Sequence, residues 1–284
     1  MEVIGASELD FKPPPLTHRG PGLEFKDLFR GTEGTPENYY FALTKQDKFY
    51  SPIHKHNFDQ FRYAYRGDFS IASDVTIRQG ELAYHPEGVE YGPQDDGNET
   101  EHILLIVQFG GASGQGFLTY DQLATGQAKL KEMGRFEKGK YYRDGSAEPQ
   151  DGFDALYQLY TGRKLEYPPG RYNTPILMKP QNFAWRPVLH QSEGSKAYKK
   201  LLGVFSERGT VAEMIKIEEG GSLSVAAEDA IQLFFVLKGK GDADGRSWEA
   251  ESAMRLQPGK RALLEAAATS EMIHFVFPML STTT

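Results

Sequence analysis

The sequence contains no cysteine among its 284 residues. Disulfide bonds, thiolate nucleophiles and Cys-ligated zinc or iron–sulfur clusters are therefore excluded together, and any metal ion must be bound by His, Asp, Glu, Gln or Tyr. Long apolar runs are also missing, because no stretch approaches the roughly 18 residues that a membrane-spanning helix needs. The stretch from Met1 to Lys12 is acidic and polar, unlike a secretion signal. We therefore expect a cytoplasmic protein with no membrane partner.

Clustered basic residues are a third absence. The net charge is −7, and Lys and Arg form no basic stripe of the kind that binding to a phosphate backbone requires. Nucleic acid is therefore not expected as a partner. The remaining composition, with 39% hydrophobic and 12% aromatic residues, is that of an ordinary globular protein, and the length favours two hydrophobic cores.

Two stretches show the pattern of a β protein. Residues 49–110 and 211–278 consist of short runs rich in aromatic and β-branched residues, interrupted by turn sequences such as Arg66-Gly67-Asp68. Frequent turns between short strands are typical of antiparallel sandwiches and barrels rather than of alternating strands and helices. We therefore predict an all-β chain with a small helical connector.

The segment between these stretches carries the helical signals. Asp151 suits an N-cap, apolar residues then fall on one helical face from Phe153 to Tyr160, and Gly162 supplies a stop. Prolines after Tyr167 indicate an extended connector. The predicted organisation is an N-terminal arm at 1–34, a first barrel at 35–118, a helical and proline-rich connector at 119–187, and a second barrel at 188–284.

A weak internal repeat links the two β stretches at an offset of 172 residues. The sequence QFRYAYRG of Gln60–Gly67 then aligns with QLFFVLKG of Gln232–Gly239, and His102 aligns with His274. One register held over this distance indicates a duplicated β unit.

The two copies differ at their polar positions. The first copy contains His54, His56 and Tyr91. At the matching positions the second copy has Ala226, Glu228 and Leu263. Because alanine and leucine offer no donor atoms, we expect any metal site to lie in the first copy only.

His54-Lys55-His56 is the principal candidate for a metal site. Alternate residues of a strand share one face, so both imidazoles can point at one ion inside a barrel. Gln60 follows four residues after His56, within reach across a turn.

These residues resemble the first sequence motif of the cupin superfamily, which is HxH, three or four residues, Glu, six residues and Gly. His54, His56, Gln60 and Gly67 reproduce that spacing, with Gln in place of Glu. The second cupin motif is Gly, five residues, Pro-x-Gly, two residues and His. It resembles the stretch from Gly80 to Tyr91, with Tyr in place of His.

Together with the repeat, the resemblance implies a bicupin, with two antiparallel β-barrels of the double-stranded β-helix or jelly-roll type. It also implies a divalent metal ion, which ligand type alone leaves open among Fe, Mn, Ni, Cu and Zn. The implied ligands are His54, His56, Gln60 and Tyr91.

Several of these roles have structural alternatives. Gln60 persists as Gln232 in the copy without histidines, so it is equally well a structural amide. His102 and His274 are interpreted as structural histidines, and so is His85. Tyr91 is a candidate ligand, a catalytic residue that orients substrate or passes a proton, or a barrel-filling aromatic. Asp59 is a second choice for the oxygen ligand, because adjacent strand residues face opposite ways.

The leading functional hypothesis is a metal-dependent enzyme acting on a small organic molecule, with dioxygenation of an aromatic, enolic or diketone substrate as the preferred reaction. A redox-inert isomerase, lyase or polyketide-cyclase-like enzyme requires the same ligands. The alternative from another class is a non-catalytic bicupin that binds a small ligand or serves as a storage-like protein. The oligomeric state stays open, with a homo-oligomer as one possibility.

Overall fold

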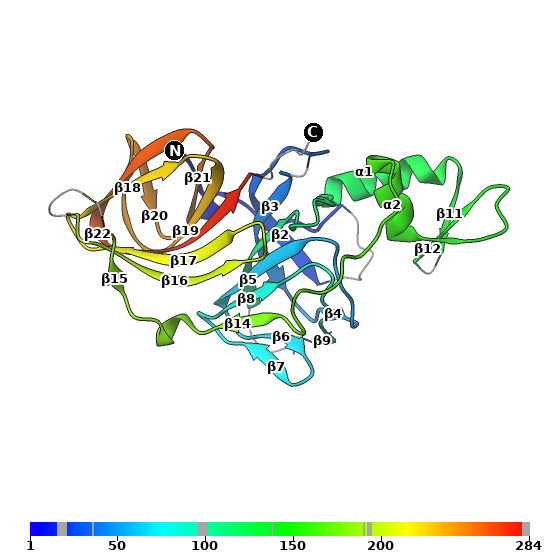
Figure 1. The fold of residues 1–284 in the computed structure, drawn as a ribbon, viewed down its shortest axis with the longest axis horizontal. Coiled ribbons are helices and arrows are strands. Elements are labelled where there is room, and N and C mark those ends of the chain that lie inside the picture. Colours follow the sequence, from blue (N-terminus) through cyan, green and yellow to red (C-terminus); the bar gives the residue numbers. More distant parts are fainter. Residues whose placement is uncertain are drawn as a thin grey trace. The chain divides into compact units, whose positions relative to one another are not determined.

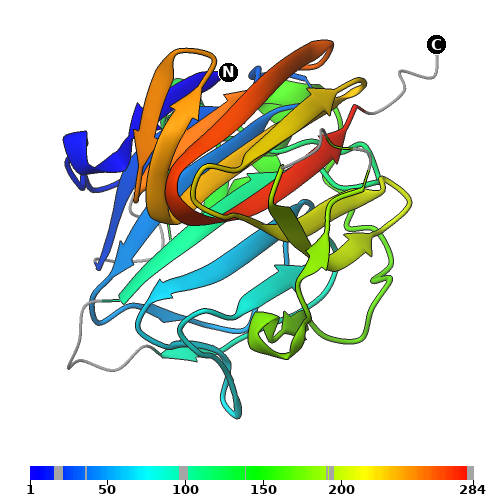
Figure 2. The ribbon, with the colours of Figure 1, turned by 90° about the vertical axis from the view of Figure 1, so that its left-hand side faces the viewer.

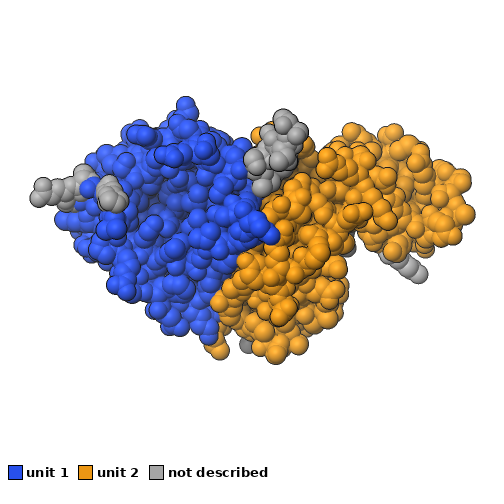
Figure 3. Space-filling view, viewed as in Figure 1, with its two compact units in different colours: residues 1–10, 80–82, 178–284 blue, residues 11–79, 83–177 orange. Residues whose placement is uncertain are grey.

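The computed structural model describes residues 1–15, 22–35, 37–95, 102–137, 139–189, 191 and 195–279. The chain divides into two compact units, which Figure 3 distinguishes by colour. The N-terminal unit comprises residues 11–79 and 83–177, and the C-terminal unit comprises residues 1–10, 80–82 and 178–284. No helix in the described ranges is both long and apolar enough to cross a membrane.

The central sheet of the N-terminal unit has six strands in the order β14-β8-β5-β10-β3-β2. Their bounds are β14 (Ile176–Met178), β8 (Leu82–His85), β5 (Asp59–Arg66), β10 (His102–Phe109), β3 (Tyr39–Gln46) and β2 (Leu23–Arg30). Two small two-stranded sheets accompany it: β4 (Tyr50–Ser51) with β9 (Gln94–Asp95), and the hairpin of β6 (Phe69–Ala72) with β7 (Val75–Ile77). β10 pairs antiparallel with both β5 and β3, which places it at the centre of this sheet.

The alternation of side chains separates two faces of β5. On one face the ring of Phe61 packs against Tyr84 and Phe109, with ring centroids 5.1 and 5.7 Å apart. Residues 60 and 62 point to the opposite face because the side chains of a strand alternate with a period of two. The functional site is built on that second face.

A mainly helical segment follows β10 and belongs to the N-terminal unit (Figure 1). It consists of α1 (Tyr120–Lys131), β11 (Gly134–Glu137), β12 (Lys140–Arg143), β13 (Gln150–Asp151) and α2 (Gly152–Thr161). As the sequence predicts, Asp151 caps α2, accepting hydrogen bonds from the amides of Phe153 and Asp154, and Gly162 ends it in the left-handed conformation. Through Leu123, Leu130 and Leu156 the two helices share one apolar cluster. The 119–187 segment is therefore divided at residue 177, and its larger part completes the first unit instead of forming a separate connector.

The C-terminal unit contains a sheet whose main path is β1-β21-β19-β22-β17-β16-β15. The bounds are β1 (Glu2–Gly5), β15 (Arg186–Pro187), β16 (Ala197–Phe205), β17 (Thr210–Ile217), β18 (Ser222–Ala227), β19 (Ala230–Ala243), β20 (Arg246–Glu249), β21 (Ser252–Leu256) and β22 (Lys260–Pro278). β18 pairs with β22, and β20 pairs with β19. β22, orange to red in Figure 2, is long enough to pair with β18 in its first part and with β17 in its second.

The two units share one strand order. In the N-terminal unit it runs β8-β5-β10-β3-β2, and in the C-terminal unit it runs β21-β19-β22-β17-β16. The duplication read from the sequence is thus present in the fold, and the antiparallel sheets agree with the predicted all-β class.

The offset of 172 residues does not hold in the last strand of the repeat. His274 on β22 lies opposite Phe234, whereas the residue opposite Arg62 on β5 is Ile106. His102 is four residues before Ile106, so the alignment of His102 with His274 is wrong. The cause is that the second copy has fewer residues between the two paired strands, which a single gapless offset cannot accommodate.

The predicted N-terminal arm at 1–34 is not one element. β1 pairs with β21, and Arg255 forms an ion pair with Glu2, which attaches the first residues to the C-terminal unit. Leu23–Arg30 instead forms β2 of the N-terminal sheet. Residues 16–21, between them, lie outside the described part of the chain.

Candidate functional site

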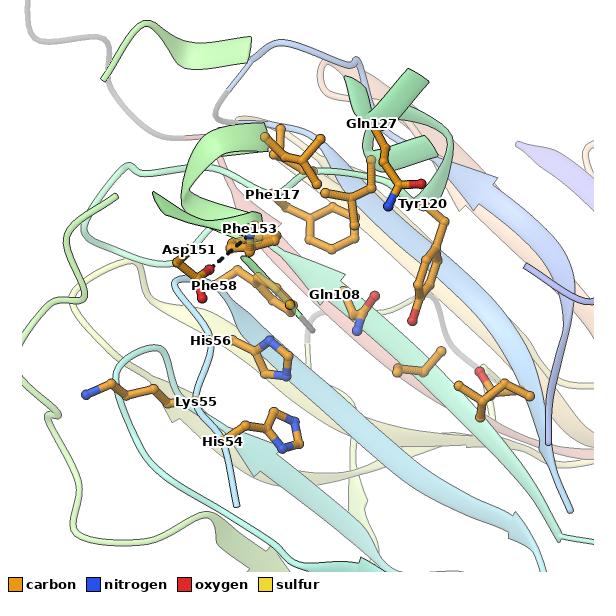
Figure 4. Close-up of a pocket in the computed structure, with 18 of the residues that line it drawn as sticks. His54, Lys55, His56, Phe58, Gln108, Phe117, Tyr120, Gln127, Asp151 and Phe153 are labelled. Atoms are coloured by element: carbon orange, nitrogen blue, oxygen red, sulfur yellow. Dashed lines mark hydrogen bonds between the residues drawn. The ribbon is translucent and has the colours of Figure 1, made fainter. Parts of the chain in front are cut away.

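The two histidines of the His-x-His sequence point to the same side of the chain. His54 and Tyr91 exchange backbone hydrogen bonds of 3.0 Å in both directions, and Figure 4 shows both imidazoles on one side with Lys55 on the other. Nδ1 of His54 lies 2.7 Å from the carbonyl oxygen of Pro52. Since a carbonyl only accepts, Nδ1 of the neutral imidazole carries the proton, and Nε2 is left as an acceptor or metal ligand.

The hydroxyl oxygen of Tyr91 is the point on which the site converges. It lies 2.9 Å from Nε2 of His54 and 2.7 Å from Nε2 of His56. The side-chain amide of Gln60 donates to it at 2.9 Å, and a guanidinium nitrogen of Arg62 donates at 2.8 Å. The Tyr91 side chain is buried. The structure therefore brings three metal candidates of the sequence, His54, His56 and Gln60, to the hydroxyl oxygen of the fourth, Tyr91.

Arg62 is a site residue that the sequence analysis missed. Its Nε donates to Oε1 of Gln60 at 3.2 Å, and its guanidinium lies 4.9 Å from the centroid of the Tyr91 ring. The available signal was its place two residues after Gln60 on a strand, which puts both side chains on one face. A buried arginine without a carboxylate partner is unusual enough to indicate a functional position.

Asp59 and Gln60 point to opposite faces of β5, as alternation predicts. The Asp59 carboxylate accepts hydrogen bonds from the Tyr84 hydroxyl at 2.8 Å and from the Glu87 amide at 2.7 Å. It is therefore engaged on the far side of the strand, and it does not reach the His54–His56 pair.

His85 contributes a buried imidazole beside the site. Its ring meets the Tyr91 ring edge-on with centroids 4.5 Å apart, and its two nitrogens have no hydrogen-bond partner among the described residues. Burial lowers the pKa of His85 well below its usual value, and the positive charge of Arg62 and the proximity of His54 lower it further. The side chain is therefore neutral around pH 7 and leaves two unused polar atoms against Tyr91.

A cavity of about 520 Å³ opens from this point within the N-terminal unit. His54, His56 and Arg62 line one part of it. Its aromatic wall consists of Phe25, Phe49, Phe58, Phe117, Tyr120, Phe136, Phe153 and Tyr167. Figure 4 shows Phe117 and Phe153 facing the same space as Phe58 and His56. An apolar cavity of this size with a few convergent polar groups is typical of a small-molecule site.

The donor atoms fit a divalent ion when Tyr91 is counted as a ligand. Two ligand atoms that are each about 2.1 Å from one ion and at right angles are about 3.0 Å apart. The contacts of the Tyr91 oxygen with the two imidazole nitrogens, 2.9 and 2.7 Å, are close to that spacing. No three His, Cys, Asp or Glu side chains of the described residues are grouped to hold an ion. With the two imidazoles, the tyrosine oxygen would therefore be the third ligand atom.

Gln60 is oriented differently from its two neighbours. Its Oε1 faces Arg62 and its Nε2 faces Tyr91, so it presents no ligand atom in this orientation. Ligation by Gln60 would require the amide to turn over and to give up its hydrogen bond from Arg62. The arrangement favours Gln60 as a positioning residue, and its role as a ligand stays a prediction.

The other two histidines that the sequence analysis discussed lie elsewhere. His102 lies at the start of β10, where Nδ1 is 2.8 Å from the carbonyl oxygen of Asp68. In the C-terminal unit, His274 contacts Glu213 at 3.0 Å and Gln232 at 3.1 Å. Both rings therefore have the hydrogen-bonding partners expected of structural histidines.

Comparison with solved structures finds three informative neighbours. A dioxygenase candidate from Nostoc punctiforme matches with a TM-score of 0.64 and 11% identity, over 100% of this chain and 84% of that chain. The pirin YhhW of Escherichia coli, in complex with nickel(II), matches with a TM-score of 0.57 and 9% identity, over 98% and 99%. Quercetin 2,3-dioxygenase from Acinetobacter baumannii matches with 0.51 and 12%, over 98% and 86%. The chain has a bicupin fold.

At these identities the likeness establishes the fold alone, and the chemistry has to be argued from the residues of the site. No family model matches the sequence, and neither does any curated protein. The residues around Tyr91 therefore carry the functional argument.

Proposed function

We propose that this bicupin is a metal-dependent enzyme acting on a small organic molecule, and that its reaction is dioxygenation of an aromatic, enolic or diketone substrate. The observation that carries the proposal is the convergence of Nε2 of His54 and Nε2 of His56 on the Tyr91 oxygen, beside an aromatic cavity. Two of the similar solved structures are described as dioxygenases, and a third contains nickel(II). These similarities support a metal-dependent reaction.

The site residues would have different roles. His54, His56 and Tyr91 would hold the ion, which when bound supplies a Lewis-acidic and, for Fe, Mn, Ni or Cu, redox-active centre. Gln60 and Arg62 fix the Tyr91 oxygen by donating hydrogen bonds to it. The aromatic wall excludes water and orients a flat substrate against the imidazoles.

A second candidate is a non-catalytic small-ligand-binding bicupin. It is favoured by the Tyr91 hydroxyl, because this group can donate its one hydrogen to Nε2 of His54 without an ion. The positive charge of Arg62, whose guanidinium nitrogen is 2.8 Å from the Tyr91 oxygen, also opposes a second positive charge nearby. Redox-inert isomerase, lyase or cyclase chemistry would use the same ligands as the first candidate.

The proposal is tested by metal analysis of the purified protein and of His54→Ala/His56→Ala. We expect one ion per chain in the wild type and loss of that ion in the double variant, with His102→Ala as a control that retains it. Oxygen uptake with flavonols and 1,3-diketones then separates dioxygenation from redox-inert chemistry. Equal metal content in the wild type and the double variant would favour the non-catalytic candidate.

A further inference from the structure

Arg62 is a buried positive charge without a negative partner. Its side chain belongs to a residue that is only 5% exposed, and its hydrogen bonds go to the neutral side chains of Gln60 and Tyr91. An isolated buried charge is costly, so guanidinium groups in protein interiors are normally paired with a carboxylate or phosphate. Within the described residues Arg62 has no such pair, and it lines the cavity.

Three of the five N–H groups of the Arg62 guanidinium are available to donate to a ligand. Of its five N–H groups, one from Nε is directed to Gln60 and one from Nη2 to Tyr91. Nη1 is buried and has no partner in the described part of the chain. Nη1 and the second hydrogen of Nη2 form the two-pronged edge that matches the oxygens of a carboxylate.

A second group of residues that line the same cavity carries unpaired polar atoms. Thr44 Oγ1, Gln46 Oε1 and Gln94 Oε1 are buried and lack a partner among the described residues, and the three residues are between 1% and 5% exposed. Two of these atoms are amide oxygens, which only accept. The ligand end that meets them must therefore carry a donor such as a hydroxyl.

The sheet register gives the separation of the strand positions that carry the two polar ends. Ile106 lies between Arg62 and Ala42 across three strands, and Thr44 is two residues further along β3. With ordinary strand spacing and rise, the Cα atoms of Arg62 and Thr44 are about 12 Å apart. Aromatic side chains line the same cavity, so the body of a ligand that spans both ends is apolar and about two rings long.

We propose that the ligand of this cavity is a two-ring aromatic carboxylate, with its carboxylate paired to Arg62 and a hydroxyl at its far end near Thr44 and Gln46. The inference deepens the proposed function and rests on it only in taking this cavity as the substrate site. It does not require that an ion be bound.

The test compares 6-hydroxy-2-naphthoate with its neutral amide, 6-hydroxy-2-naphthamide, by calorimetric titration. Because hydrogen bonds to a charged partner are the strong ones, we expect the wild type to bind the acid about tenfold more tightly than the amide. Arg62→Met should remove this preference. Arg143→Met, which removes the same charge from an exposed position, should keep it. Thr44→Val should reduce the advantage of 6-hydroxy-2-naphthoate over 2-naphthoate.

Equal affinity for acid and amide in the wild type, including no measurable binding of either, would overturn the proposal, and so would a preference that survives Arg62→Met. If Arg62→Met does not fold, the wild-type comparison and Arg62→Lys decide, because Lys keeps the charge and loses the two-pronged edge. Each titration is repeated after removal of metal with EDTA. An acid preference in a protein that binds no ion refutes the proposed function alone, and a bound ion without an acid preference refutes this inference alone.

Discussion

At the residue scale, the hydroxyl oxygen of Tyr91 is the common contact of the side chains in the functional site. Four nitrogen atoms, from His54, His56, Gln60 and Arg62, lie 2.7 to 2.9 Å from the Tyr91 hydroxyl. The sequence could identify three of these side chains and the tyrosine, because motif spacing and strand alternation place them on one face. It could not show that the Tyr91 hydroxyl lies at the centre of the site. That position depends on how the β8–β9 loop packs against β5, and these two segments are far apart in the sequence.

Tyr91→Phe tests this arrangement by removing one oxygen and keeping the ring. The donors of Gln60 and Arg62 then lose an acceptor in a buried place, so we expect the free energy of unfolding to fall by about 1–3 kcal/mol. Urea denaturation measures the change. Tyr50→Phe is the matched control, because Tyr50 is 56% exposed, and it should stay within about 0.5 kcal/mol of the wild type. Equal stabilities of the two variants would show that the hydroxyl is not an organising contact.

The helical segment decides the shape of the cavity at the scale of elements. The sequence predicted α2 because its Asp151 cap, apolar face and Gly162 stop are all local signals. α1 was not predicted, although Thr119 and Gln122 form a capping box that is visible in the sequence as Thr-x-x-Gln. Its weak apolar periodicity explains the omission. That the segment would line the first unit's cavity was not readable, because that packing depends on residues far apart in the sequence.

Asp151→Ala should loosen α2 and with it one wall of the cavity. Its carboxylate accepts from the amides of Phe153 and Asp154 at 3.0 and 3.3 Å, and the loss of such a cap costs about 1 kcal/mol. Hydrogen exchange should therefore become several-fold faster at the amides of α2 while those of β10 stay protected. Asp144→Ala, on an exposed turn, should leave both unchanged. Unaltered exchange in α2 would contradict the role of the cap.

At the scale of the whole molecule, the chain forms two units, and each unit is made of segments that are not continuous in sequence. The repeated pattern of strands predicted the duplication, since both copies carry the same alternation of apolar residues and turns. It could not predict that residues 1–10 would join the C-terminal unit, because β1 finds its partner β21 about 250 residues later. Both tryptophans, Trp185 and Trp248, lie in that unit, so their fluorescence reports on it separately.

Acid should weaken the C-terminal unit through Glu213. Burial raises the pKa of this carboxyl, but its hydrogen bond and charge interaction with His274, together with Lys199, outweigh burial and lower the pKa below 4.5. A carboxyl with a lowered pKa in the folded state stabilises the fold fully above its unfolded pKa, and this stability is lost as the pH falls below about 4.5.

The prediction is that Glu213→Gln flattens this loss. Urea midpoints followed by tryptophan fluorescence between pH 6 and about pH 3 should fall more steeply in the wild type than in the variant. Glu249→Gln, at an exposed carboxyl, should follow the wild-type curve. Parallel curves for Glu213→Gln and the wild type would show that another group governs the acid response.

α1 and α2 lie in one continuous segment of the chain, which affects how such a protein can diversify. Arg62 and Thr44 lie on strands of the sheet and His54 and His56 lie on the segment just before β5, whereas much of the apolar cover of the cavity comes from residues 117–167. Replacement or recombination of that segment would change the shape of accepted molecules while leaving His54, His56 and Arg62 in place. Selection can therefore act on the breadth of substrates and on the reactive centre as two separable traits.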